Sequence, residues 1–129
     1  MVLYARLWKE IAMRLLVCGD RDWQDYDLLW REIAVLNPAI VIEGEARGAD
    51  LMARTAAYSL SIEVIAFPAQ WNKYGKAAGP IRNQQMLTEG RPDMVLAFHD
   101  SITSSKGTAN MIRIAKLAGV PVKLVSHPK

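Results

Sequence analysis

The sequence predicts an α/β fold, namely a single three-layer α/β/α domain built on a mainly parallel sheet of five strands. Three observations predict it. The chain has 129 residues, which suits one domain with one good core. Short apolar runs alternate along the chain with longer amphipathic runs. Most of the short runs are continuously apolar, as is typical of parallel strands that helices cover on both faces.

The five expected strands are short apolar runs rich in β-branched side chains. Pro68 directly follows the third run, and because proline cannot donate a hydrogen bond to a neighbouring strand, it ends that run. The strands are expected over residues 14–18, 39–43, 63–67, 94–98 and 120–125.

Four expected helices fill the intervals between these strands. In the first, four apolar residues recur at the spacing of one helical face, and the second is rich in alanine, which lets a helix lie close to a sheet. The last is closed by Gly119, a residue type that suits a helix C-terminus. The helices are expected over residues 27–37, 50–60, 81–89 and 108–119, and residues 68–80 are expected to form a loop.

Composition and charge exclude several classes of protein. Hydrophobic residues make up 51% and charged residues 22%, which is ordinary for a globular protein. No apolar run approaches the roughly 20 residues of a membrane-spanning helix, and the start of the chain resembles no secretory signal. We therefore expect a cytoplasmic protein with no membrane partner. The net charge of +3 permits a phosphate-bearing partner without requiring one.

The sequence lacks the usual metal-binding patterns. HExxH and CxxC motifs are absent, so neither a metal nor another cofactor is expected. Cys18, the single cysteine, cannot form a disulfide within the chain and is expected to be a small core residue. His99 and His127 are the two histidines. His99 lies in the region that faces the site, but no serine-histidine-acid pattern accompanies it, so we expect it to be a solvated loop residue.

Residues 1–12 are an N-terminal extension to a domain that covers residues 13–129. Leu3, Leu7, Trp8 and Ile11 recur at helical spacing in the extension. A helix lying on the domain surface is one interpretation, and a contact with a partner or a second copy of the chain is the other. Whether the protein forms a homo-oligomer therefore remains an open alternative.

The candidate site lies at the carboxyl ends of the strands, where an open parallel sheet binds its ligands. Residues 19–23, "GDRDW", follow the first strand. Gly19 permits a sharp exit, Arg21 can make a forked contact to phosphate, and Trp23 offers a flat face for a base. A turn in which Trp23 simply packs on the following helix remains the alternative.

Residues 44–50, "GEARGAD", follow the second strand and contain little hydrophobic mass. Gly44 and Gly48 remove side chains where a ligand could approach, and Arg47 supplies a positive charge. Asp50 either caps the next helix or accepts a sugar hydroxyl. The stretch is thus either a tight turn into a helix or a turn built around a bound anion.

A long polar and aromatic segment follows the third strand. Trp71 and Tyr74 argue against disorder, so we interpret the segment as the lid or wall of a pocket, or else as a plug at the edge of the core. Arg82 and Asn83 open the next helix. After the fourth strand, Lys106, Gly107 and Thr108 belong to a small-residue turn that could cradle phosphate, although it is not a P-loop.

These motifs together resemble the SLOG superfamily of Rossmann-like nucleotide-binding domains, and within it the YspA-type family. The resemblance covers about residues 13 to 125. It depends on "GDRDW", "EGEARGAD", "FPAQWNKYGKAAGPIRNQQM" and "SKGTANMI", in this order and at these spacings. It implies a Rossmann-like fold and a ligand that is a nucleotide or a nucleotide derivative, such as an ADP-ribose-like or nucleotide signalling molecule.

Two other members of the superfamily share short motifs with this sequence. The DNA-processing protein DprA has an ARG-[IA]-D turn and an RN pair, as residues 46–50 and 82–83 do here. The LOG phosphoribohydrolases have an R-x-x-x-M helix, which residues 82–86 match, and a GGxGTxxE loop, of which Gly107 and Thr108 match part. Met111 stands where the glutamate of that loop would be, and Glu45 stands where the family commonly has glycine. The Glu45 carboxylate is expected to point away from any bound phosphate.

Three classes of function follow from these motifs. The first is a sensor or sequestering protein that binds a nucleotide without chemistry, which the missing glutamate favours. The second is a nucleotide-processing hydrolase of the phosphoribohydrolase kind, with Asp50, Asp22 or Glu45 as its acid or base. The third is a single-stranded nucleic-acid binder. Phosphate and backbone contacts are expected from Gly19, Arg21, Gly44, Arg47, Gly48, Arg82, Lys106, Gly107 and Thr108, ribose contacts from Asp50 and Asn83, and base stacking from Trp23, Trp71 and Tyr74.

Overall fold

A computed structural model of the protein describes residues 12–129 and contains one five-stranded sheet. The strands are all parallel and lie in the order β3-β2-β1-β4-β5. The predicted α/β fold with a parallel five-stranded sheet is therefore confirmed. The helix predicted within residues 1–12 lies outside the described residues, apart from Ala12. The strands are β1 (Arg14–Gly19), β2 (Ile40–Glu43), β3 (Glu63–Ala66), β4 (Met94–Phe98) and β5 (Val122–Val125).

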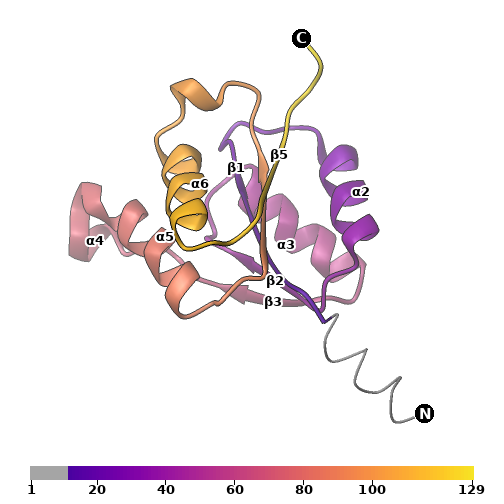
Figure 1. Cartoon of the computed structure of the whole chain (residues 1–129), viewed down its shortest axis with the longest axis horizontal. Coiled ribbons are helices and arrows are strands. Elements are labelled where there is room, and N and C mark those ends of the chain that lie inside the picture. Colours follow the sequence, from indigo (N-terminus) through magenta and orange to yellow (C-terminus); the bar gives the residue numbers. More distant parts are fainter. Residues whose placement is uncertain (1–11) are drawn as a thin grey trace.

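Helices cover both faces of the sheet (Figure 1). α2 (Tyr26–Leu36) and α3 (Ala49–Ser59) pack on one face, and α5 (Ala78–Thr88) and α6 (Gly107–Leu117) pack on the other. No helix of residues 12–129 is long and apolar enough to cross a membrane.

Two hydrophobic clusters, one on each face, hold the layers together. Side chains of a strand alternate between faces, so β1 contributes Leu15 and Val17 to the cluster under α2 and α3. Leu16 and Cys18 belong to the cluster under α5 and α6. Cys18 is a buried core residue, as predicted, although it also borders the hollow described below.

Residues 68–80 differ from the predicted loop. They contain α4 (Trp71–Tyr74), a 3-10 turn (Gly75–Ala77) and the first residues of α5. α5 begins at Ala78, three residues before the predicted start, and includes Pro80. The prediction placed Pro80 outside the helix, but proline is tolerated in a first helical turn, where backbone N–H groups have no partner within the helix.

The order of the strands reverses between β1 and β4. The chain leaves β1 through α2 towards β2, whereas it leaves β4 through α6 towards β5 on the other side. The loops after β1 and β4 therefore diverge and leave a crevice at the carboxyl end of the sheet, which is where open α/β sheets bind ligands.

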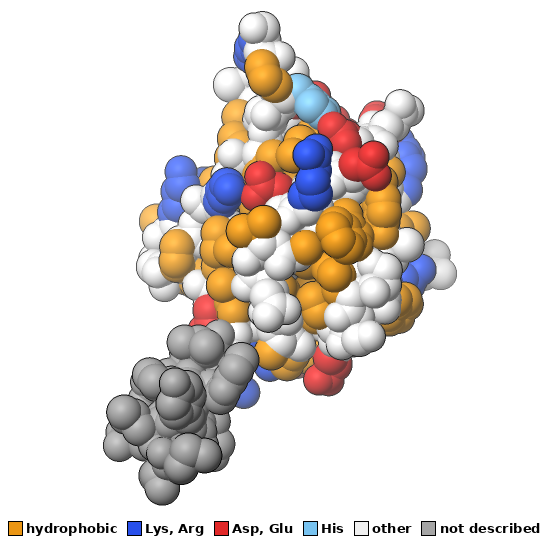
Figure 2. Space-filling model, turned by 90° about the vertical axis from the view of Figure 1, so that its right-hand side faces the viewer, with side chains coloured by type: hydrophobic (Ala, Val, Ile, Leu, Met, Phe, Trp, Pro, Cys, Tyr) orange, Lys and Arg blue, Asp and Glu red, His pale blue; other side chains and the backbone are white. Residues whose placement is uncertain are grey.

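The C-terminal segment closes one corner of the same edge of the sheet. His127 donates its backbone N–H to the Asp100 carboxylate, and the Ser126 hydroxyl donates to the carbonyl of His99. Figure 2 shows a histidine beside acidic side chains near this end of the chain. The corner is thus tied to the loops that follow β1 and β4.

Candidate functional site

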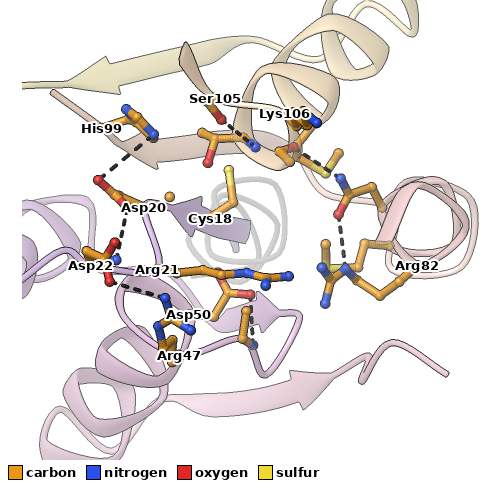
Figure 3. A pocket seen from close by; sticks show the side chains of 17 residues that line it. Cys18, Asp20, Arg21, Asp22, Arg47, Asp50, Arg82, His99, Ser105 and Lys106 are labelled. Atoms are coloured by element: carbon orange, nitrogen blue, oxygen red, sulfur yellow. Dashed lines mark hydrogen bonds and ion pairs between the residues drawn. The ribbon is translucent and has the colours of Figure 1, made fainter. Parts of the chain in front are cut away.

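A hollow of about 270 Å³ lies at the carboxyl ends of β1 and β4 (Figure 3). We call it the first hollow. Nine of the fourteen predicted site residues line it: Gly19, Arg21, Arg47, Asp50, Arg82, Asn83, Lys106, Gly107 and Thr108. Its other lining residues are Cys18, Asp20, Asp22, Ala46, Met86, His99, Ser105 and Met111.

A second hollow, of about 380 Å³, lies beside the first. Arg21, Ala46, Arg47 and Arg82 line both hollows, so they form the boundary between them. The second hollow brings in two further predicted residues, Gly44 and Trp71, and is completed by Glu45, Pro68 and Ala69.

Gly48 and Gly44 allow the turn after β2 to pack closely against its neighbours. Gly48 has a φ of +79°, and a Cβ there would overlap the backbone oxygens of Asp20 and Arg21. A Cβ on Gly44 would overlap the guanidinium group of Arg82. Gly48 lines neither hollow, so its place in the fold is explained by the close approach of the β1 loop.

Arg82 fixes the wall of the site from α5. Its side chain is 8% exposed, and Nη1 donates to the carbonyl of Gly44 while Nε donates to Oδ1 of Asn83. The amide nitrogen of Asn83 in turn donates to the Gly107 carbonyl and to Oδ1 of Asn110. Arg82 and Asn83 therefore join the turn after β2 to the start of α6.

Asp50 lies in the first turn of α3 and is 5% exposed. The predicted alternative that it caps this helix is wrong, because the cap position falls on Gly48 and the Asp50 carboxylate accepts a hydrogen bond from the N–H of Ala46. Burial raises the pKa of Asp50 to about 6, against the opposing effect of the nearby Arg82 charge. The Asp50 carboxyl group thus lines the first hollow and gains or loses its proton near pH 6.

Arg21 and Arg47 are more exposed than Arg82. The Arg47 guanidinium lies 3.3 Å from the carboxylate of Asp22, and both side chains are mostly solvent-exposed, so this ion pair adds little stability. Arg21 reaches across the hollow between Asp50 and Arg82 (Figure 3). Its Cζ atom also lies 5.6 Å from the ring centroid of Trp71.

The start of α6 forms the opposite rim. The hydroxyl of Ser105 accepts hydrogen bonds from the N–H groups of Thr108 and Ala109, so a side chain of the protein already satisfies these two donors. Lys106 and Gly107 are exposed beside them, and Thr108 is buried. Ser105 was not among the predicted site residues, although serine three positions before Thr108 is a typical cap.

Trp23 and Tyr74 line neither hollow. Trp23 is 4% exposed, packs against Phe98 and stacks on the His127 ring at a centroid distance of 4.8 Å. Tyr74 lies on α4 with the ammonium group of Lys73 over its ring. The structure therefore puts Trp23 in the core and leaves Trp71 as the aromatic side chain at the hollows.

His99 differs from its predicted role as a solvated loop residue. It is buried, its Nδ1 accepts a hydrogen bond from the N–H of Ser101, and its Nε2 lies 4.0 Å from the Asp20 carboxylate. The expected exposure is therefore wrong, whereas the expected place is not: His99 directly follows β4 and lines the first hollow beside Asp20 of the loop after β1.

Two acids at the end of β2 and in the turn after it, Glu43 and Glu45, make local contacts. Glu43 is fully buried, with one carboxylate oxygen accepting from the Glu45 N–H and the other unpartnered among residues 12–129, and burial raises its pKa to about 7. The Glu45 carboxylate pairs with Arg54 at 2.9 Å, as suits an acid directed away from a phosphate. Within residues 12–129, no three His, Cys, Asp or Glu side chains gather as a metal site would require.

Comparison with known proteins gives the family. Residues 13–74 match the family described as YspA, cpYpsA-related SLOG family. The Gene 61 protein of Mycobacterium phage D29 is 35% identical over 119 residues, which cover 84% of this chain and 93% of that protein. This chain belongs to the YspA-related SLOG family.

A solved structure confirms the fold. The X-ray structure of DNA processing protein A (DprA) from Streptococcus pneumoniae matches with a TM-score of 0.72 and 18% identity. The match covers 88% of this chain and 50% of that one, so this chain spans half the length of DprA. At this identity the likeness shows a shared Rossmann-like fold.

Proposed function

We propose that this domain binds a nucleotide or nucleotide derivative, of the ADP-ribose-like or nucleotide signalling kind, as a sensor or sequestering protein. The observation that carries the proposal is that Arg21, Arg47 and Arg82 meet at a hollow where the strand order reverses. Guanidinium groups bind phosphate through paired N–H donors, and this position is where open α/β sheets bind ligands. Family membership is consistent with a nucleotide or nucleic-acid ligand.

Binding without turnover is supported by the wall that α6 contributes. Met111, which stands where LOG phosphoribohydrolases have a glutamate, is buried and lines the first hollow. An apolar thioether cannot transfer a proton, so the LOG mechanism has no acid at this place.

Hydrolysis of a nucleotide is the second candidate, and Asp50 favours it. Its buried carboxyl group lines the first hollow with a pKa of about 6, which suits a general acid or base. Formation of product from the ligand that binds would support this candidate. If the ligand binds and no product forms, the sensor or sequestering role remains the proposed function.

Binding of single-stranded nucleic acid is the third candidate, favoured by the likeness to a DNA processing protein. Exposed Arg47 and Lys106 line the hollows, and exposed Lys73 lies on α4 beside Trp71, which lines the second hollow. Retention of a single-stranded oligonucleotide on a filter, with steep loss at higher salt, would support it. Absence of retention even at low salt would contradict it.

The proposed function is tested by replacing Arg47 with alanine and measuring thermal unfolding with AMP, ADP, ADP-ribose, NAD, cyclic nucleotides and a short oligonucleotide. A ligand at about 100 times its Kd stabilises the wild type by roughly 2.7 kcal/mol. R47A should lose most of this shift, because a phosphate contact is gone, while its melting temperature without ligand stays near the wild-type value.

Arg113→Ala is the matched control, because Arg113 is an exposed arginine of α6 that lines neither hollow. R113A should respond to the ligand as the wild type does. An R47A protein that unfolds without ligand would make Arg47 structural. Failure of every compound to shift the wild type would overturn the proposed function.

A further inference from the structure

The second hollow is the part of the site that the phosphate contacts alone do not explain. The first hollow, at about 270 Å³, is smaller than the roughly 300–1,000 Å³ of ordinary small-molecule pockets. The second adds about 380 Å³ directly beside it. A ligand that entered both would have room for two organic parts, one on each side of the shared boundary.

The boundary between the hollows is positively charged. Three of its four residues are Arg21, Arg47 and Arg82. Burial lowers the pKa of the Arg82 guanidinium, the nearby Asp50 carboxylate opposes this shift, and the neighbouring Arg21 charge lowers the pKa further. Like charges held side by side repel each other, and a bound anion relieves that repulsion. The boundary is therefore the place in this site that best suits a phosphate or diphosphate group.

The second hollow also has an exposed aromatic wall. Trp71 is 48% exposed, and α4, on which it lies, buries none of its residues. The far edge of the indole rests against α5, because a Cβ built on Gly79 would lie 3.5 Å from it. The Arg21 guanidinium lies over the Trp71 ring at 5.6 Å. The Trp71 side chain thus borders the second hollow, with the Arg21 guanidinium over its ring and at the charged boundary.

The first hollow, on the opposite side of the boundary, lacks an exposed aromatic ring and mixes polar groups with apolar ones such as Met86 and Met111. The first hollow offers the carboxyl of Asp50 and the hydroxyls of Ser105 and Thr108, whereas the Asn83 amide is already engaged by Arg82, Gly107 and Asn110. Such groups pair with hydroxyls of a sugar or another polar group. The two hollows therefore differ in chemistry as well as in position.

We propose that the two hollows form one two-part site, in which Trp71 and Arg21 stack on a heteroaromatic ring in the second hollow. The three arginines hold the phosphate or diphosphate that follows the ring, and the first hollow holds a polar group beyond it. The ligand class is thus a nucleotide whose phosphate carries a second organic group. This inference depends on the proposed function, because it divides the same site into parts.

The test compares W71A, W71F and wild-type protein by calorimetric titration with ADP-ribose, AMP and ribose 5-phosphate. Loss of base stacking should weaken ADP-ribose and AMP by about 10- to 100-fold in W71A. W71F keeps a ring and should lose only a small part of the affinity. Ribose 5-phosphate has no ring to stack, so its binding should be equal in all three proteins.

Tyr74→Ala is the matched control, because Tyr74 is an exposed aromatic residue of the same short helix but lines neither hollow. Y74A should bind all three compounds as the wild type does. The melting temperatures of W71A and Y74A without ligand should stay close to that of the wild type, since α4 has no buried residue.

The outcomes separate this inference from the proposed function. If W71A binds ADP-ribose as tightly as the wild type while R47A does not, the ring subsite is wrong and the phosphate site stands. If W71A weakens ribose 5-phosphate as much as AMP, Trp71 supports the arginines structurally and the two-part site is wrong. If the wild type binds none of the three compounds, both proposals are overturned.

Discussion

Two charged clusters lie at the carboxyl edge of the same sheet and are organised in opposite ways. In the first hollow, Arg82 is held in place by buried hydrogen bonds, and Arg21 and Arg47 lie beside it. At the neighbouring corner, the acids Asp25 and Asp100 meet across the ring of His127. The acidic corner carries its own counter-charge on the C-terminal segment. Among residues 12–129, Arg47 has an exposed ion pair with Asp22 and Asp50 lies near Arg82, but neither Arg21 nor Arg82 forms an ion pair with an acid. We propose that an external anion supplies the missing counter-charge of the arginine cluster.

Removal of Arg82 is expected to break the arginine cluster most severely. R82A removes two hydrogen bonds of a buried group, leaves the Gly44 carbonyl without this donor, and takes a positive charge away from Asp50. Because buried polar groups left without partners are costly, the free energy of unfolding should fall by about 2–4 kcal/mol. Urea denaturation measures it. R47A, in the exposed part of the same cluster, should change it by less than about 0.5 kcal/mol, and equal losses would contradict the distinction.

The buried acids beside the arginines should make stability depend on pH. Burial raises the pKa of Asp50 from 3.8 to about 6 and that of Glu43 from 4.5 to about 7. The folded protein therefore binds these protons more tightly than the unfolded chain, and the free energy of unfolding falls as pH rises from about 4 to 7. For Asp50 this fall is up to about 3 kcal/mol.

Asp50→Asn removes one titrating group while keeping an oxygen that can accept from the Ala46 N–H. Urea denaturation at several pH values should therefore show a shallower fall in D50N than in the wild type. Asp93→Asn is the control, since Asp93 is an exposed acid that lines neither hollow. A slope unchanged in D50N would mean that Asp50 is ionised throughout this range.

The acidic corner should respond to pH in the opposite sense, and with the smallest effect. Hydrogen bonds with Asp100 and Asp25 raise the pKa of His127, and hydrogen bonds with His127 lower the pKa of each acid. The contacts of His127 with Asp25 and Asp100 should contribute their full stability at pH values between 3.8, the ordinary pKa of an aspartate, and 6.5, the ordinary pKa of histidine. They are lost as pH rises through the raised pKa of His127, or falls through the lowered pKa of the acids.

His127 stacks on Trp23, so tryptophan fluorescence can follow this loss. The emission should change between neutral and alkaline pH in the wild type, and H127A should abolish that change while leaving ligand binding intact. Because all three groups are exposed, the effect on global stability should be small. A fluorescence change that persists in H127A would assign it to another tryptophan.

The order of elements could be predicted from local pattern because apolar runs and helical periodicity are properties of neighbouring residues. Nine of the fourteen predicted site residues line the first hollow because parallel strands bring their carboxyl ends to one edge. What local pattern left open or misjudged is burial. His99 was expected in solvent and is buried, and Trp23, expected either to stack on a base or to pack within the fold, is buried against Phe98 and His127.

The sequence alone therefore determined the α/β class, the positions of the strands and the edge of the sheet at which charged and small residues collect. Only the tertiary structure decided which of these residues face the hollows. It turned Gly48 towards the loop after β1, buried Trp23 beneath the C-terminal segment, and joined Arg82 to Gly44 across 38 residues of chain. The reason is that the direction of a side chain follows from its own backbone, whereas its burial depends on which distant segments of the chain pack against it.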